Sequence, residues 1–323
     1  MQAILAVTIP FFALVLAGYL AARRHVLPES AIPGLNAFVL YFALPCMLFR
    51  FGMNTPVLQL LNPFVLGVYV ACALVIVFFT IAVTWHEPVG LKDAAFGALV
   101  AAFPNTGFMG VPLLVALLGD AAAGPVICTV LADLFVTSSL CIALAQAHGA
   151  THAGEPRNAR AALARALKGA LSNPLPWSIA LGALFSVFSI RLSGPVDVVV
   201  RMLADAASPV ALFTIGAVLH RAEQHDHSRT PVARFLPVAL IKLFVHPLLV
   251  LAAGSAARQL GAPLSSFQLL VLTLAAALPS ASNVSLLAER YGADNGRIAR
   301  IIMSSTALAF VSFSGLAWLL VGR

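Results

Sequence analysis

The chain has 323 residues, of which 61% are hydrophobic and only 10% are charged, with 19 Lys and Arg against 12 Asp and Glu. The apolar residues come in blocks close to the ~20 residues that cross a bilayer core. This composition excludes a soluble globular domain and predicts an all-α integral membrane protein. The net charge of +7 indicates membrane topology, so we expect no nucleic-acid partner, and we also expect no cofactor.

Ten apolar stretches predict ten transmembrane helices. They cover residues 2–21, 35–53, 63–85, 94–117, 124–146, 173–191, 196–219, 233–256, 267–288 and 298–320. The first stretch lacks a basic leading region and is followed by Arg23 and Arg24, so we expect it to remain as a helix rather than be cleaved as a secretion signal.

The positions of the basic residues predict the orientation of these helices. Most Lys and Arg side chains fall in the loops on one side of the layout, whereas Arg191, Arg258 and Arg323 lie at the opposite ends. Because positively charged loops stay in the cytoplasm, both termini should be extracytoplasmic. We expect a multi-pass protein of a plasma membrane, namely a bacterial inner membrane.

The second half of the sequence resembles the first. Residues 44–49 (LPCMLF) resemble residues 208–213 (SPVALF), and residues 103–106 (FPNT) are matched more loosely by residues 278–283 (LPSASN). Because each half has an odd number of helices, five, the second half is inverted in the membrane relative to the first. In this arrangement the broken helices four and nine cross near the midplane of the membrane. We predict two inverted repeats at 1–148 and 173–323, joined by a cytoplasmic linker at 149–172 whose basic amphipathic helix lies on membrane lipid.

Residues 104–112 (PNTGFMGVP) interrupt the fourth apolar stretch with prolines, glycines and polar residues. Each proline removes a backbone donor, so the freed backbone groups need other partners. Broken helices also present half-helix N-termini, whose free donors suit an anionic carboxylate. Alternatively, the polar side chains only satisfy the freed backbone. The candidate substrate-binding residues are Pro104, Asn105, Thr106, Gly110, Pro279, Ser280, Ser282 and Asn283.

Several ionisable residues lie inside the predicted spans, where a charge is costly and must face protein or a water-filled path. The candidates for a coupling role are Asp133, Arg201, Asp205, Lys242 and His246. Arg201 and Asp205 are four residues apart on one helical face, and a local ion pair that neutralises both is the competing interpretation. Arg50 could attract an anion at the outer end of the second span, although snorkelling to the interface explains its position equally well.

The sequence offers little support for a metal site or an enzyme. The four cysteines lack metal-ligand spacing and are interpreted as small buried hydrophobic residues. The histidine-rich loop at residues 220–227 is interpreted as a solvated turn rather than a metal site. An intramembrane enzyme built on Asp133 and Asp205 is disfavoured because neither residue lies in a protease-like context.

Several short motifs resemble the two crossover helices of the auxin efflux carrier family. They are residues 104–106 (PNT) and 110–114 (GVPLL), together with Leu278-Pro279, Ala288 and Tyr291-Gly292. The resemblance covers the ten-span layout and implies an architecture similar to that of the bile-acid carriers. It implies a fixed scaffold of helices 1, 2, 6 and 7, and a mobile transport domain of helices 3–5 and 8–10. It also implies substrate bound where helices four and nine cross, and a homodimer formed through the scaffold.

The bacterial organic-acid branch of this family is the closer likeness. Plant exporters carry an acidic and a basic residue in span three, whereas residues 63–84 contain no charge here. We therefore predict a secondary transporter of small organic anions, mono- or dicarboxylates, with a proton or sodium ion as candidate coupling ion. The alternative is a cation/proton antiporter or sodium-coupled symporter of the same architecture, although Asn105 and Asn283 stand where an antiporter places carboxylates.

Overall fold

The computed structural model describes residues 2–56, 62–86, 89–149, 164, 167–225 and 230–322. Over these residues the chain is helical, and extended pairing is limited to two isolated bridges. Seven of the described helical segments are long and apolar enough to cross a membrane. They are Gln2–Arg23, Glu29–Asn54, Pro63–Thr84, Asp120–Gln146, Gly194–Arg221, Val232–Gln259 and Asn295–Val321. The chain is therefore a multi-pass membrane protein.

Three of the ten predicted spans are not long continuous helices. The predicted spans 94–117 and 267–288 are each divided into two shorter helices, and the predicted span 173–191 contains a helix of only 14 residues. The count of ten crossings and the inversion of the two halves therefore remain predictions. The basic amphipathic helix predicted in the linker falls mostly outside the described residues.

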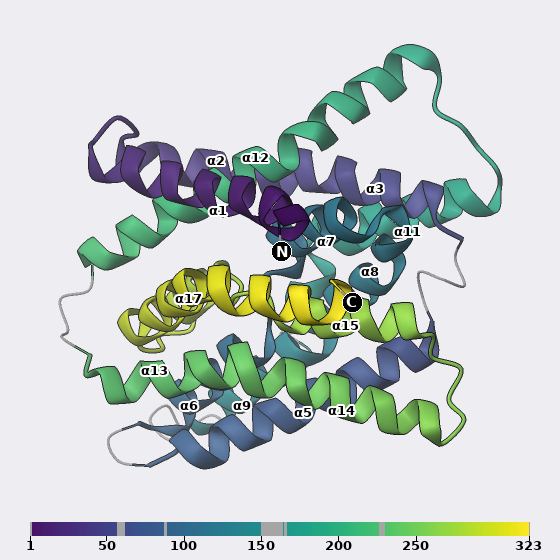
Figure 1. The fold of residues 1–323 in the computed structure, drawn as a ribbon. Helices are drawn as coiled ribbons and strands as arrows, with labels where there is room; N and C mark the ends of the chain where they lie inside the picture. The colour runs from purple at the N-terminus through teal and green to yellow at the C-terminus, as the bar shows by residue number, and fades with distance from the viewer. Residues whose placement is uncertain are drawn as a thin grey trace.

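One group of helices forms the upper part of the molecule in Figure 1. It contains α1 (Gln2–Arg23), α2 (Ile32–Phe38), α3 (Leu44–Asn54), α11 (Pro174–Val187) and α12 (Gly194–His225). We call these helices the upper bundle. Within it α1 packs along α12, and α3 packs along both α11 and α12.

Glycines allow the helices of the upper bundle to approach closely. A Cβ atom at Gly18 of α1 would overlap the backbone of α12, and one at Gly216 of α12 would overlap the backbone of α1. Gly52 of α3 and Gly182 of α11 have the same relation to each other's helices. Small residues at such contacts let two helix backbones pack tightly inside a membrane.

The remaining helices form a second group, which we call the lower bundle. Its members are α5 (Pro63–Thr84), α6 (Leu91–Ala102), α7 (Val111–Leu118), α8 (Ala123–Ala132), α9 (Ser138–Gly149), α13 (Val232–Leu240), α14 (His246–Gln259), α15 (Ser266–Ala276), α16 (Val284–Arg290) and α17 (Asn295–Val321). In Figure 1, α5, α6, α9, α13 and α14 lie lowest, while α7, α8, α15 and α17 lie between them and the upper bundle. The helices predicted for the scaffold lie in the upper bundle and those predicted for the transport domain lie in the lower bundle, and both roles remain predictions.

Local sequence explains where two helices of the lower bundle begin. The Asn62 side chain accepts the backbone N–H groups of Phe64 and Val65, which caps α5 directly before Pro63. At α15, Ser265 and Gln268 form a reciprocal capping box. Such caps satisfy donors that have no partner within the first turn of a helix.

Arg297 lies in the first turn of α17, although its charge suggested a place in a cytoplasmic loop. Its guanidinium is buried and donates from Nε to the Arg234 carbonyl at 2.9 Å and from Nη1 to the Asp93 carbonyl at 2.9 Å. Asp93 also accepts the backbone N–H of Asp294. These bonds join α6, α13 and α17 at one end of the lower bundle.

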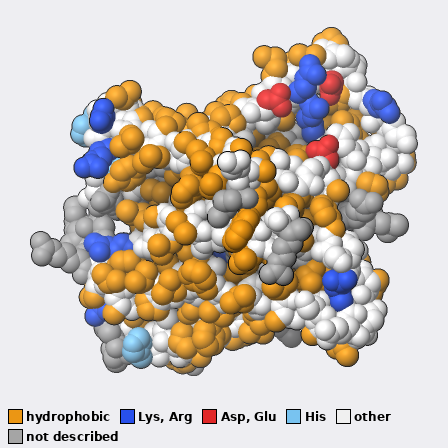
Figure 2. Space-filling model, in the orientation of Figure 1, with side chains coloured by type: hydrophobic (Ala, Val, Ile, Leu, Met, Phe, Trp, Pro, Cys, Tyr) orange, Lys and Arg blue, Asp and Glu red, His pale blue; other side chains and the backbone are white. Residues whose placement is uncertain are grey.

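The outer surface of the molecule is strongly apolar. Figure 2 shows hydrophobic side chains over most of the visible face, with Lys, Arg, Asp and Glu near its edges. Large exposed residues such as Phe78, Trp177 and Leu184 are each at least half exposed. Apolar exposure on this scale is suited to contact with lipid rather than water.

Candidate functional site

The two broken segments lie against each other in antiparallel directions. The backbone N–H of Asn105 donates to the Pro279 carbonyl at 2.8 Å, and the N–H of Ala281 donates to the Phe103 carbonyl at 3.0 Å. Pro104 and Ser280 form the bridge between these two bonds. The prolines end α6 and α15, and each break supplies the other with hydrogen-bonding partners, as buried backbone requires. We call residues 103–110 and 277–283 the crossing.

Asn105 restarts the chain as a helix after the first break. Its carbonyl accepts the N–H groups of Met109 at 3.1 Å and Gly110 at 2.9 Å, which closes the π-helical turn Thr106–Gly110. A Cβ atom at Gly110 would lie 2.6 Å from Cδ1 of Leu278 in the other segment. Close packing between the segments therefore explains this glycine without contact to a ligand.

Several polar side-chain atoms in the crossing have no protein partner. Thr106 Oγ1, Ser280 Oγ and Asn283 Oδ1 are buried and accept or donate no hydrogen bond, although the Ser280 backbone N–H donates to Ser305 Oγ at 3.2 Å. A buried polar group without a partner costs about 1–3 kcal/mol. These atoms therefore need a partner from outside the described protein groups, such as water or a polar ligand.

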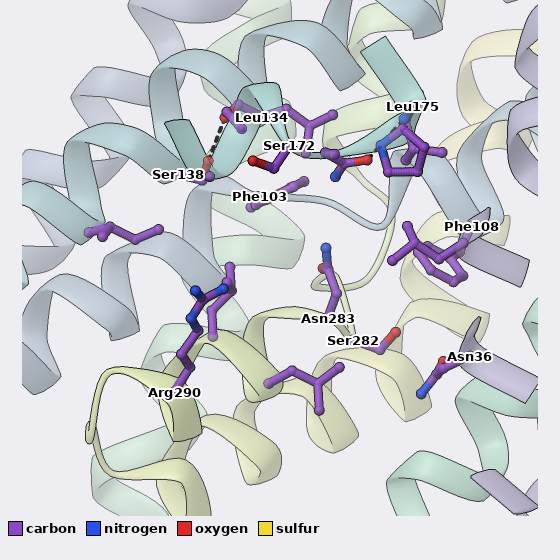
Figure 3. A pocket seen from close by; sticks show the side chains of 18 of the residues that line it. Asn36, Phe103, Phe108, Leu134, Ser138, Ser172, Leu175, Ser282, Asn283 and Arg290 are labelled. Atoms are coloured by element: carbon purple, nitrogen blue, oxygen red, sulfur yellow. Dashed lines mark hydrogen bonds between the residues drawn. The ribbon is translucent and has the colours of Figure 1, made fainter. Parts of the chain in front are cut away.

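A cavity of about 400 Å³ reaches the crossing from one end of the molecule. Its lining comes from both bundles, with Asn36 and Asn173 from the upper side and Phe103, Ser282 and Asn283 from the crossing. In Figure 3 the Asn283 and Arg290 side chains extend into the space between the labelled residues. We call this space the crossing cavity.

Arg290 is the one charged side chain among the described residues that line the crossing cavity. It comes from the end of α16, and its guanidinium lies 5.9 Å from the centre of the Tyr291 ring. A lining with one cation, several amides and hydroxyls and no carboxylate is suited to bind an anion.

Only two of the predicted substrate-binding residues, Ser282 and Asn283, line the crossing cavity. The other six are buried in the crossing itself, namely Pro104, Asn105, Thr106, Gly110, Pro279 and Ser280. Arg290 is a site residue that the sequence does not predict, because it follows an apolar stretch where a basic residue is ordinarily a cytoplasmic loop charge. Tyr291 and Gly292, which directly follow Arg290, belong to the family motif, so the position of Arg290 next to this motif is the one sequence feature that could have indicated its role.

Three of the predicted coupling residues form one buried cluster. Asp133, Lys242 and His246 are all fully buried. The Tyr69 hydroxyl donates to Asp133 Oδ2 at 3.0 Å, and the Thr137 hydroxyl donates to Asp133 Oδ1 at 3.2 Å. Lys242 Nζ and His246 Nδ1 are 3.5 Å apart. We call these five residues the buried polar cluster, in which Tyr69 and Thr137 were not predicted.

The buried polar cluster lies behind the crossing, at the C-terminal ends of the two half-helices. Lys242 Nζ donates to the carbonyl of Ala276, the last residue of α15, and His246 Nε2 is buried without a hydrogen-bond partner in the described structure. Carbonyls at a helix C-terminus lack intrahelical donors and carry partial negative charge. Positively charged or donor side chains are stabilised there.

Arg201 and Asp205 lie far from this cluster and do not form the expected local ion pair. Both side chains are exposed, and no hydrogen bond or salt bridge joins them in the described structure. They line a second cavity of about 580 Å³ together with Arg50 and Asp120. Exposed charges gain little from pairing because water solvates both partners.

The described residues contain no group of three or more His, Cys, Asp or Glu that could hold a metal ion. The solvated turn predicted at residues 220–227 is wrong for residues 220–225, which continue α12 and include the buried His220, and His227 lies outside the described residues. No disulfide joins the four cysteines in the described structure. Cys72, Cys128 and Cys141 are buried, as predicted, whereas Cys46 is only partly buried.

Comparisons with known proteins extend over almost the whole chain. A family model described as membrane transport protein matches residues 3–317. A Rhizobium meliloti (strain 1021) protein named "Putative malonate transporter" is 30% identical over 325 residues, covering 99% of this chain and 97% of the relative. The Escherichia coli (strain K12) protein named "Uncharacterized transporter YfdV" is 25% identical over 320 residues, covering 98% and 96%. Auxin efflux carrier component 8 of Arabidopsis thaliana is 22% identical over 335 residues, covering 89% of each chain.

Proposed function

Because this chain belongs to the family of membrane transport proteins, the auxin efflux carrier family that its sequence resembles, we propose that it is a secondary transporter of small dicarboxylates such as malonate. The family and its relatives make the chain a transporter of a small molecule and not an enzyme. The relative named for malonate supports the choice of this anion as the first substrate to test.

The lining of the crossing cavity is the observation that carries the proposal. Arg290 would bind one carboxylate of the substrate through paired charge-assisted hydrogen bonds. The second carboxylate would accept hydrogen bonds from Ser282 and Asn283 at the crossing. With no acidic side chain among the described lining residues, nothing in this lining repels a dianion.

Alternating access would arise from movement of the lower bundle against the upper bundle. The crossing cavity lies between the two bundles at one end, and the second cavity lies between them at the other end. A small displacement could therefore close one cavity while it widens the other. In this mechanism the upper bundle is the scaffold, through which two chains would pair as a homodimer.

The buried polar cluster is the best candidate for coupling to a proton. Asp133, Lys242 and His246 are ionisable, buried together and linked through Lys242 to the end of α15 beside the crossing. A change in their protonation would alter the hydrogen bonds that hold this helix end. Because the Lys242 amino group already occupies the carbonyl at that helix end, we favour a proton over a sodium ion.

Exchange of cations is the weaker alternative for this fold. An antiporter of this architecture needs a carboxylate at the crossing to bind its ion. Asn105 and Asn283 occupy the corresponding positions, and the described crossing residues include no Asp or Glu.

Uptake and equilibrium binding of malonate in proteoliposomes test the proposed function. Arg290→Gln and Asn283→Ala should each weaken malonate binding by about 1.5–3 kcal/mol, or roughly ten- to a hundredfold, because each removes a hydrogen bond to a charged group. Arg258→Gln is a matched control, since Arg258 is exposed and does not line the crossing cavity. Native affinity in both test variants, or no binding of any mono- or dicarboxylate by the wild-type protein, would refute the proposal.

A further inference from the structure

The second cavity lies on the opposite side of the crossing from the crossing cavity. It is lined by Arg50 of α3, Arg201 and Asp205 of α12, and Pro112 of α7. Phe108 lines the crossing cavity, and Pro112 follows it by four residues on the same segment. About one helical turn therefore separates the two cavities along this segment. We call the second cavity the outer vestibule, after its predicted side of the membrane.

Arg50 carries a buried donor that no protein group accepts. Its Nη1 atom is shielded from solvent and has no hydrogen-bond partner in the described structure. A side chain that snorkels to the membrane surface would place its guanidinium in water, so snorkelling does not explain this buried atom. A planar guanidinium with a free donor at the wall of a cavity is suited to bind a carboxylate.

The basic residues of the outer vestibule all come from the upper bundle, whereas each bundle supplies one acidic residue. Arg50, Arg201 and Asp205 belong to the upper bundle, whereas Asp120 belongs to the turn Asp120–Ala122 of the lower bundle. No salt bridge joins Arg50 to Asp120 or Asp205 in the described structure. Among these four residues, the upper bundle therefore contributes one net positive charge and the lower bundle one carboxylate.

We propose that Arg50 binds a carboxylate of the transported anion in the outer vestibule, and that Asp120 opposes this binding as a resident negative charge of the same site. The inference rests on the proposed function and adds a second anion site to it, on the far side of the crossing from Arg290. Substrate would pass between Arg50 and Arg290 as the bundles move. Arg50 would thereby set the affinity at one face of the membrane only.

Malonate counterflow in right-side-out and inverted membrane vesicles tests this site, because each preparation presents one face to the added substrate. Arg50→Gln should raise the KM for malonate about tenfold at the vestibule face and leave the KM at the opposite face unchanged. Arg50→Lys keeps the charge but not the planar pair of donors, so its KM should lie between those of wild type and Arg50→Gln.

Asp120→Asn should change the KM for malonate in the opposite direction to Arg50→Gln. Removing the resident negative charge should lower the KM at the vestibule face by a few-fold, and added salt should reduce this gain. Arg191→Gln is the matched control for charge, because Arg191 is exposed in the connection between α11 and α12 and does not line the vestibule. It should leave the KM at both faces unchanged.

The possible outcomes separate this site from the proposed function. If the wild-type protein shows counterflow but Arg50→Gln leaves the KM for malonate unchanged, the Arg50 site is overturned and the proposed function is not. The same conclusion follows if Arg191→Gln raises the KM as much as Arg50→Gln does, or if Arg50→Gln raises the KM equally at both faces. An absence of wild-type counterflow refutes the proposed function first. A rise confined to inverted vesicles supports the Arg50 site and reverses the predicted topology. If Arg50→Gln fails to fold, opposite KM shifts in Arg50→Lys and Asp120→Asn still decide the question.

Discussion

At the scale of single residues, Asp133 and Lys242 illustrate how the chain tolerates charge inside a membrane. Two hydroxyls donate to the Asp133 carboxylate, and Lys242 donates to a helix-end carbonyl. When both groups are ionised, they attract each other at longer range, because no salt bridge joins them in the described structure. Each is therefore satisfied by local hydrogen bonds and balanced by the other at longer range.

A double-mutant cycle on this pair should show that balance. Lys242→Met leaves the Asp133 carboxylate buried without a nearby positive charge, so it should destabilise the protein by up to about 3–5 kcal/mol. Adding Asp133→Asn should recover part of that loss. The measurement is thermal unfolding in detergent, with Lys168→Met as control because Lys168 is exposed. Strictly additive losses would show that the two charges do not interact.

At the scale of helices, the paired breaks of the crossing are the feature that shapes the site. Each interrupted helix would leave backbone groups unsatisfied in an apolar setting, and the antiparallel pairing of Phe103–Asn105 with Pro279–Ala281 satisfies them. The same pairing brings unpartnered hydroxyl and amide atoms together at one place. Polar side chains that are 170 or more residues apart in the sequence thus form one candidate site.

Pro104→Ala should damage transport more than it damages folding. The new backbone N–H would allow α6 to continue past Ala102, which competes with the bond from Asn105 to the Pro279 carbonyl. Malonate uptake per folded molecule should fall at least about tenfold, as expected when catalytic or binding groups are misplaced. Pro10→Ala is the control, because α1 already continues through Pro10. Equal uptake by both variants would show that the break is not needed.

At the scale of the whole molecule, two close helix contacts hold the upper bundle together. α1 meets α12 through Gly18 and Gly216, while α3 meets α11 through Gly52 and Gly182. If the two halves are inverted repeats, α1 corresponds to α11 and α3 corresponds to α12, so the contact of α1 with α12 would be the counterpart of the contact of α11 with α3. The upper bundle is thus packed through backbone contacts, as the proposed scaffold would require, whereas both cavities lie at its boundary with the lower bundle.

Labelling from the two sides of the membrane should establish the orientation. In a background without the four native cysteines, Asp120→Cys should react with an impermeant thiol reagent in intact cells, and Glu289→Cys should react only after permeabilisation. Both positions are exposed in the structure, so a lack of reaction reports the side of the membrane rather than burial. The reverse pattern would place the termini in the cytoplasm.

The sequence by itself determined the helical membrane class, the family and the two breaks, because these depend on apolar blocks and on proline chemistry that act locally. It also identified Asp133, Lys242 and His246, since a charge inside an apolar span is costly in any fold. Tertiary structure alone decided that these three share one cluster with Tyr69, whose hydroxyl carries no signal within an apolar run. It also placed Arg290 in the crossing cavity and left Arg201 unpaired with Asp205. The reason is physical: whether a charged side chain meets a partner, a cavity or water depends on helices that are distant in sequence and packed together only in the fold.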